Sequence, residues 1–185
     1  MAGYWCGFRT CWRERRKPCF APSPISSSPR CIASRLRRRT PRYRRYISSH
    51  EIANKANQVR QLRGWKKFQT PRGSIYHLEE VFEDLNQRFF YGLMARPLLT
   101  WSQLRARSSL GHYDPAHNAI VISRIFDHPQ VPRYALEYIL YHEMLHLKHP
   151  VRLRGSRRCV HSPEFQAEEN LFPQLEQAKA FLRRL

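Results

Sequence analysis

The stretch RYALEYILYHEMLHLKH, residues 133–149, constrains the fold of this chain more than any other segment. Its apolar residues recur at steps of three and four, which predicts an α-helix. Pro132 stands where a helix can start, and Pro150 closes the pattern. It is the longest helical pattern in the sequence, so any fold proposed for the chain has to accommodate it.

A second helix is expected earlier, over residues 74–97. Ser74 is suited to cap its start, and Gly92 and Pro97 mark its exit. Its apolar residues follow a helical spacing. They are Leu78, Phe82, Leu85, Phe89 and Leu93. We expect this stripe to face the core.

Short strands are expected between these two helices. The candidates are residues 98–101, 111–113 and 119–126, the last two joined by a turn rich in Asp, Pro and Asn. A charged loop, 151–160, then leads to a last helical segment that starts at Ser162 and is interrupted at Pro173. The order of helix, short antiparallel sheet, long helix and C-terminal helix predicts a small α+β domain.

Charge divides the chain near residue 70. The net charge is +19, and residues 1–70 carry 18 Lys and Arg against two acidic residues, whereas residues 71–185 carry 15 against 12. We therefore interpret 1–50 as a basic arm that lacks the apolar content to fold alone, and 74–185 as the folded domain. The linker between them, 51–73, has a helical pattern that Gly64 would end.

The basic residues indicate DNA as a candidate partner. Arginines interleaved with Tyr43 and Tyr46 can neutralise phosphates and stack on bases, while a solvated tail is the alternative interpretation. The candidate nucleic-acid contacts are Arg38, Arg39, Arg42, Arg44 and Arg45 in the arm and Arg154, Arg157 and Arg158 in the charged loop.

The remaining composition favours a cytoplasmic protein that needs no membrane. No apolar run approaches the roughly 18 residues of a membrane span, and the five cysteines form an odd set without close pairs. A disulfide framework is therefore a poor interpretation. The cytoplasm is the predicted location, and the oligomeric state is not indicated.

The long helix contains the pentad His142-Glu143-Met144-Leu145-His146, an H-E-x-x-H pattern. Two histidines four residues apart differ by about 40° around a helix axis and by about 6 Å along it, so both imidazoles can converge on one metal ion. Glu143 can then face a zinc-activated water without binding the metal, and can pass the water's proton to a leaving amine. These are the residue types that amide hydrolysis needs.

A catalytic zinc needs a third protein ligand. His149 lies about 10.5 Å along the helix from His142, too far for a shared ion, and is better interpreted as a helix C-terminal charge. His161 is the better candidate, because it follows a loop able to reverse direction. The alternatives are carboxylates that either bind the metal or hydrogen-bond an imidazole. They are Glu164, Glu168 and Glu169.

Several motifs together resemble the SprT-like (Spartan-related) zinc metalloprotease family over roughly residues 74–184. They are Trp101-Ser102, Gly111-His112-Tyr113, Asn118 to Ser123, Pro132 with the helix after it, HEMLH, and VHSPEF at 160–165. The resemblance implies a zincin-like fold, zinc as the cofactor, the ligands His142, His146 and His161, and Glu143 as the catalytic residue. No cysteine follows Cys159, which implies a compact bacterial member without the C-terminal zinc ribbon.

The resemblance also implies a protein substrate and relation to proteases that digest DNA-crosslinked proteins. For a compact bacterial member it implies a location in the bacterial cytoplasm, with association to the nucleoid as a further expectation. We expect a zinc metallopeptidase in which Ala119 to Ser123 is an edge strand that pairs with the substrate. The alternative is a nucleic-acid-binding zinc protein whose metal is structural or whose hydrolysis is vestigial. For the oxyanion, the candidates are Tyr113, Tyr138 and Tyr141, with core packing favoured for the last two.

Overall fold

The computed structural model describes residues 42, 45–46, 49–64, 66–154 and 157–185. Its five helices are α3 (His50–Arg63), α4 (Leu78–Phe90), α5 (Arg133–Lys148), α6 (Pro163–Glu169) and α7 (Leu175–Arg184). Its strands are β1 (Leu98–Trp101), β2 (Gly111–Asp114), β3 (Ala119–Ile122), β4 (Arg152–Arg154) and β5 (Arg157–Cys159), with a 3-10 turn, η1 (Arg124–Phe126). The expected α+β class is confirmed.

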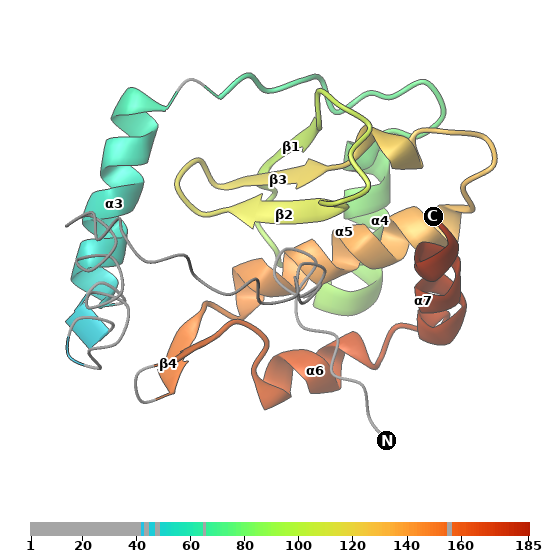
Figure 1. The fold of residues 1–185 in the computed structure, drawn as a ribbon. Coiled ribbons are helices and arrows are strands. Elements are labelled where there is room, and N and C mark those ends of the chain that lie inside the picture. Colours follow the sequence, from blue (N-terminus) through green and yellow to red (C-terminus); the bar gives the residue numbers. More distant parts are fainter. Residues whose placement is uncertain (1–41, 43–44, 47–48, 65, 155–156) are drawn as a thin grey trace, which may run out of the picture.

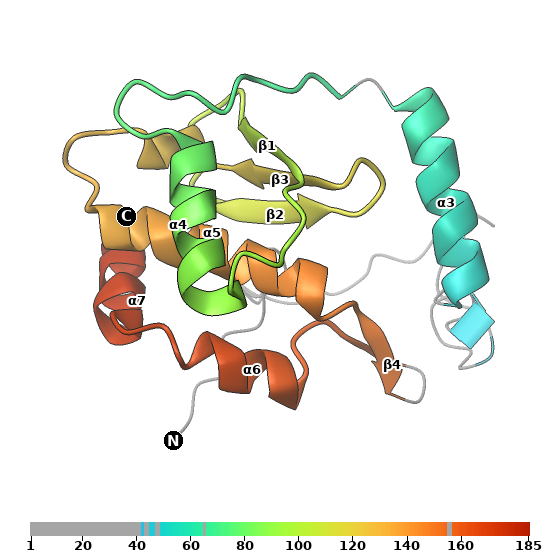
Figure 2. The same ribbon diagram turned by 180° about the vertical axis from the view of Figure 1, so that it is seen from behind.

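Helix α5 is the centre of the molecule. Every residue from Ala135 to Leu145 is buried, so the helix is enclosed on all sides. In Figure 1 the sheet lies above α5 and α4 lies behind it, and Figure 2 shows α4 in front; α6 and α7 pack against other sides of the helix. The long helical pattern of the sequence is therefore the core of the fold.

The three-stranded sheet has the order β1-β3-β2, which places β3 in the middle. β3 pairs parallel with β1 and antiparallel with β2, so the expectation of a purely antiparallel sheet is wrong in that detail. The expectation that Ala119 to Ser123 forms an edge strand is also wrong, because its four strand residues are apolar, buried and paired on both sides. The edge strand beside α5 is β2.

Helix α4 begins four residues later than the sequence predicts. Ser74 is not its N-cap, because the backbone N–H groups of Ser74, Ile75 and Tyr76 instead donate to the carboxylate of Asp127 (2.7, 2.8 and 3.3 Å). The helix also ends earlier, since Tyr91 turns into the left-handed region (φ 55°). Leu93 is consequently 85% exposed and does not belong to the core stripe.

Residues 66–77 form a strap that follows the sheet and then enters α4 (Figure 2). Lys66 forms an ion pair with Asp114 (2.5 Å), and Gln69 exchanges hydrogen bonds with the Thr100 hydroxyl (2.7 and 3.0 Å). The Pro71 carbonyl accepts a hydrogen bond from the Trp101 indole (3.0 Å). The strap thus joins the sheet to α4 through polar contacts.

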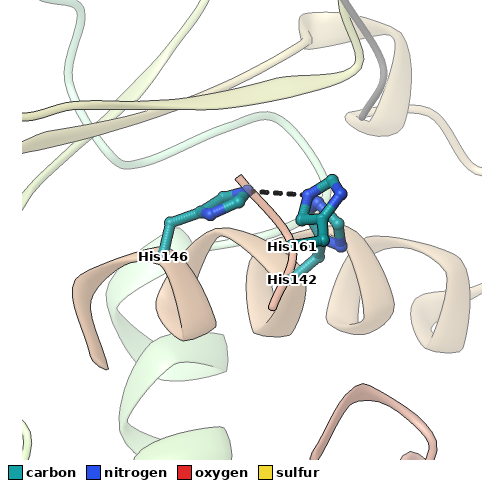
Figure 3. Close-up of side chains that lie close together, drawn as sticks. All are labelled: His142, His146 and His161. Carbon is teal, nitrogen blue, oxygen red and sulfur yellow. Dashed lines mark hydrogen bonds between the residues drawn. The ribbon is translucent and has the colours of Figure 1, made fainter. Parts of the chain in front are cut away.

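The C-terminal part of the chain begins with the segment that connects α5 to α6. The expected charged loop is a hairpin, with Arg152 opposite Cys159 and Arg154 opposite Arg157. It reverses the chain and delivers His161 back towards α5, next to His146 (Figure 3). Ser162 caps α6 by accepting a hydrogen bond from the Phe165 N–H (3.2 Å), as the sequence predicts for a helix that starts there.

Candidate metal centre

Three histidines converge at the C-terminal half of α5. His142 and His146 lie one turn apart on that helix, and His161 reaches them from the loop after β5 (Figure 3). Ligand nitrogens of the three rings all lie within 4.8 Å of one another, so the three could hold a metal ion. Among the residues that the structure describes, no other group of three or more His, Cys, Asp or Glu side chains comes this close together.

The spacing of two ring nitrogens matches a tetrahedral ion. The Nε2 atoms of His146 and His161 are 3.3 Å apart. Two nitrogens bound at about 2.05 Å and separated by a tetrahedral angle lie about 3.4 Å apart. The donor set, three imidazoles, is also one that zinc accepts.

Burial keeps two of these rings neutral. It lowers the pKa of His146 to about 3 and that of His161 to about 4, with the neighbouring His142 adding to both shifts. A metal binds the unprotonated imidazole, so a histidine held neutral is ready as a ligand. Phe165 is fully buried and packs against all three rings, with centroids 4.6–5.1 Å from them.

Glu143 lies beside the cluster and faces β2. It is 3% exposed, and burial raises the pKa of its carboxyl to about 7, although His142 and a hydrogen bond from the Tyr113 N–H act to lower it. A carboxyl with a pKa near neutrality can take up and release a proton under ordinary conditions.

The close approach of β2 to Glu143 depends on Gly111. A Cβ atom at this position would lie 2.9 Å from Ile139 Cγ2 and 3.0 Å from Glu143 Oε1. Gly111 therefore allows the strand to sit directly on α5. The sequence marks this glycine only as part of a strand, and no sequence pattern indicates the backbone donor at Tyr113.

The three glutamates that the sequence offers as alternative ligands or hydrogen-bond partners lie in different environments. Glu164 is exposed, and Glu168 pairs with Lys148 (2.8 Å) and His149 (3.3 Å). Glu169 accepts a hydrogen bond from His142 Nδ1 (2.7 Å). Among the described residues, the ligand atoms that lie within 4.8 Å of one another belong to the three histidines, and none of these carboxylates is included. His149 lies at the α5 C-terminus, against Glu168.

The three candidate tyrosines are engaged elsewhere. Tyr138 donates to Glu169 (3.0 Å), Tyr141 donates to the Glu168 carbonyl (2.8 Å) and Tyr113 donates to Asn118 (3.1 Å). Tyr138 and Tyr141 are each 2% exposed, which agrees with core packing. Their hydroxyls tie α5 to α6.

The candidate nucleic-acid contacts are spread over several places. Arg38, Arg39 and Arg44 lie outside the described residues, and so do the side chains of Arg154 and Arg157. Arg42, Arg45 and Arg158 are exposed. Arg158 lies on β5, three residues before His161, so the basic hairpin adjoins the histidine cluster.

No helix within the described residues combines the length and apolar character needed to cross a bilayer. No curated protein and no solved structure is similar enough to this chain to count as a match. A family model described as the SprT-like family matches residues 78–178, more than half of the chain, and this range contains the sheet and all three histidines. The chain therefore belongs to the SprT-like family.

Proposed function

We propose that this protein is a zinc-dependent peptidase whose metal is held by His142, His146 and His161. One observation carries the proposal: three imidazoles converge within 4.8 Å, two of them at the spacing of a tetrahedral site, while Glu143 is buried beside them. Family membership adds weight, because a SprT-like domain suggests a metallopeptidase.

The chemistry assigned to each group follows from its place. Zinc held by three neutral imidazoles supplies Lewis acidity towards water and towards a peptide carbonyl. Glu143 acts as the general base: a carboxylate oxygen accepts a proton from the attacking water and passes it to the nitrogen of the leaving amine. The Tyr113 N–H holds this carboxylate in position.

The substrate is proposed to pair with the outer edge of β2. Ser123 N–H donates to the Leu110 carbonyl across the β2–β3 ladder (2.8 Å), so the alternation of an antiparallel pair turns the backbone groups of Gly111 and Tyr113 away from β3. The Tyr113 N–H is already used by Glu143. The Gly111 N–H and both carbonyls are left for an extended peptide.

The direct test is Glu143→Gln with casein as substrate. We expect a rate at least about 100-fold below that of the wild type, because the general base is lost while the side-chain volume is kept. Zinc content should not change. Glu164→Gln is the matched control, since it makes the same chemical change at an exposed position near the site, and it should cleave at the wild-type rate.

Equal cleavage by wild-type protein and a zinc-loaded Glu143→Gln variant would rule out this mechanism. Absence of cleavage in every variant, despite full zinc content, would point to the second candidate function, a nucleic-acid-binding protein with a structural metal.

Binding to nucleic acid, which is the whole of the second candidate function and would be an addition to the first, is favoured by the charge of the first 70 residues and by α3. Residues 1–70 have a net charge of +16, and α3 exposes Lys55, Arg60 and Arg63 to solvent. We propose that this region tethers the peptidase to DNA in the bacterial cytoplasm, and that the exposed Arg158 beside the cluster extends the contact.

Salt dependence tests the tether. Binding of single-stranded DNA should weaken steeply with added salt in the full chain, and deletion of residues 1–50 should flatten that slope. An unchanged slope would mean that residues 1–50 do not contribute to DNA binding. Absence of binding by the full chain at low salt would mean that DNA is not a partner of this protein.

A further inference from the structure

We propose that Glu169 is the positioning residue of His142: its Oε1 atom, itself held by the Tyr138 hydroxyl, keeps the imidazole proton on Nδ1, so that Nε2 carries the lone pair that a metal would bind. The inference rests on the metal site proposed above. It adds a function for a carboxylate that the sequence leaves undecided among three glutamates.

The contact is short and largely enclosed. Glu169 Oε1 lies 2.7 Å from His142 Nδ1 and 3.0 Å from the Tyr138 hydroxyl. His142 is 5% exposed and Tyr138 is 2% exposed. Two buried groups on α5 thus meet a single carboxylate oxygen on α6.

The chemistry of the partner decides which nitrogen carries the proton. An ionised carboxylate only accepts hydrogen bonds, so the nitrogen that faces it must be the one that carries hydrogen. In neutral His142 the proton therefore sits on Nδ1, and Nε2 is the nitrogen that carries the lone pair a metal would bind. A ligand histidine held in this way is fixed both in tautomer and in ring orientation.

Tyr138 fixes the carboxylate in turn. Tyr138 and His142 are four residues apart on α5, so their side chains lie on the same face, one above the other. The Tyr138 hydroxyl donates to the same oxygen as His142. Glu169 is thereby held at two points along the helix and has little freedom to swing towards the histidine cluster.

Glu169 stands behind His142 and does not belong to the ligand set. Among the described residues, the atoms that lie within 4.8 Å of one another belong to the three histidines, and no Glu169 oxygen is among them. A role as fourth ligand would require the carboxylate to leave both of its hydrogen-bond donors.

The adjacent residue provides a matched control. Glu168 lies on the same helix, but its side chain contacts Lys148 and His149 at the surface end of α5. Glu168→Ala therefore removes a carboxylate from α6 without touching His142. A difference between the two alanine variants isolates the contact with His142 from the general effect of charge or helix loss.

The first experiment records the ring nitrogens of His142 by nitrogen-15 NMR in the metal-free full chain. Wild-type protein and Glu168→Ala should hold the proton on Nδ1. Glu169→Ala should shift His142 towards the Nε2-protonated tautomer, a change that a purely structural role would not produce.

The second experiment measures zinc affinity by competition with a chelator. Glu169→Ala should bind zinc about 10- to 100-fold more weakly than the wild type, and Glu168→Ala within about twofold of it. Glu169→Gln, whose amide oxygen can still accept from Nδ1, should recover part of the loss. Tyr138→Phe, which removes only the hydroxyl, should lose about three- to tenfold and serves as the test if Glu169→Ala does not fold.

An unchanged His142 tautomer together with unchanged zinc affinity in Glu169→Ala, or equal losses in Glu168→Ala and Glu169→Ala, would overturn the inference. These readouts need no peptidase activity. Failure of all variants to cleave a substrate would thus contradict the proposed function and leave this assignment standing.

Discussion

Individual residues around the histidine cluster are placed by close packing and by backbone hydrogen bonds. The Tyr113 N–H donates to Glu143, and Gly111 lets the strand approach α5 closely enough for that bond. Both contacts join residues about 30 positions apart. Neither leaves a local pattern in the sequence, whereas the H-E-x-x-H spacing that places His142 and His146 does.

Gly111→Ala should impair catalysis without removing the metal. The added methyl group would meet Ile139 Cγ2 at 2.9 Å and Glu143 Oε1 at 3.0 Å, so the strand or the carboxylate must move. We expect at least a tenfold loss of peptidase rate and a loss of about 1–3 kcal/mol in the free energy of unfolding. The peptidase rate, the zinc content and chemical denaturation are measured on the same preparation, so that the loss of rate, the retention of metal and the loss of stability are each checked. A wild-type rate would mean that the contact does not position Glu143.

Asp127 links acid stability to the start of α4. Burial acts to raise the pKa of its carboxyl, but hydrogen bonds from the N–H groups of Ser74, Ile75 and Tyr76 outweigh burial, and the pKa is lowered. The folded pKa is thus below the unfolded value of about 3.9. The stabilisation is complete above that value and is lost as pH falls through the folded pKa.

Asp127→Asn should therefore lower the free energy of unfolding by about 2 kcal/mol at pH 7, and by much less at pH 3. Urea denaturation at both pH values measures the difference. Glu80→Gln, at an exposed position of α4, is the control and should match the wild type at both. If Asp127→Asn lost as much free energy of unfolding at pH 3 as at pH 7, the charge of Asp127 would not be the source of the stabilisation.

Elements whose formation depends on local periodicity could be predicted from the sequence. The core helix α5 and the Ser162-capped α6 appear where the spacing of apolar and capping residues puts them. The position of β3 could not be predicted, because an apolar run is compatible with either a central or an edge strand. The β4–β5 hairpin, rich in arginine, has the composition of a solvated loop.

The strap, residues 66–77, contains the boundary at residue 74 that the sequence predicts between linker and domain. It has no helical or strand period, yet Lys66, Gln69 and Pro71 each bond to the sheet. Its contacts are to residues 30 to 48 positions away in the chain. We therefore propose that the folded unit begins near residue 66 and not at residue 74.

Two truncations test this boundary. Deletion of residues 1–64 should leave the free energy of unfolding within about 1 kcal/mol of the full chain, since α3 is largely exposed. Deletion of residues 1–73 removes an ion pair and three hydrogen bonds to the sheet, and should cost at least about 3 kcal/mol. Equal stability of the two shortened chains would place the boundary at residue 74.

At the scale of the whole molecule, the positive charge is concentrated in the part of the chain that precedes the range matched by the family model. The net charge of +16 lies in the first 70 residues, and the remainder carries +3. Helix α3 stands beside the domain in both views (Figures 1 and 2) and reaches it through a hydrogen bond from Gln61 to the Ala116 carbonyl. This arrangement is the basis of the proposal that a basic region tethers the proposed peptidase domain to DNA.

The central claim is that three histidines from two parts of the chain hold one zinc ion. Metal analysis by mass spectrometry of the purified wild type, His161→Ala and His149→Ala tests it most directly. We predict about one zinc per chain in the wild type and in His149→Ala, whose histidine lies at the end of α5 outside the cluster, and little or none in His161→Ala. Absence of zinc from the folded wild type, or equal zinc in all three proteins, would contradict the claim.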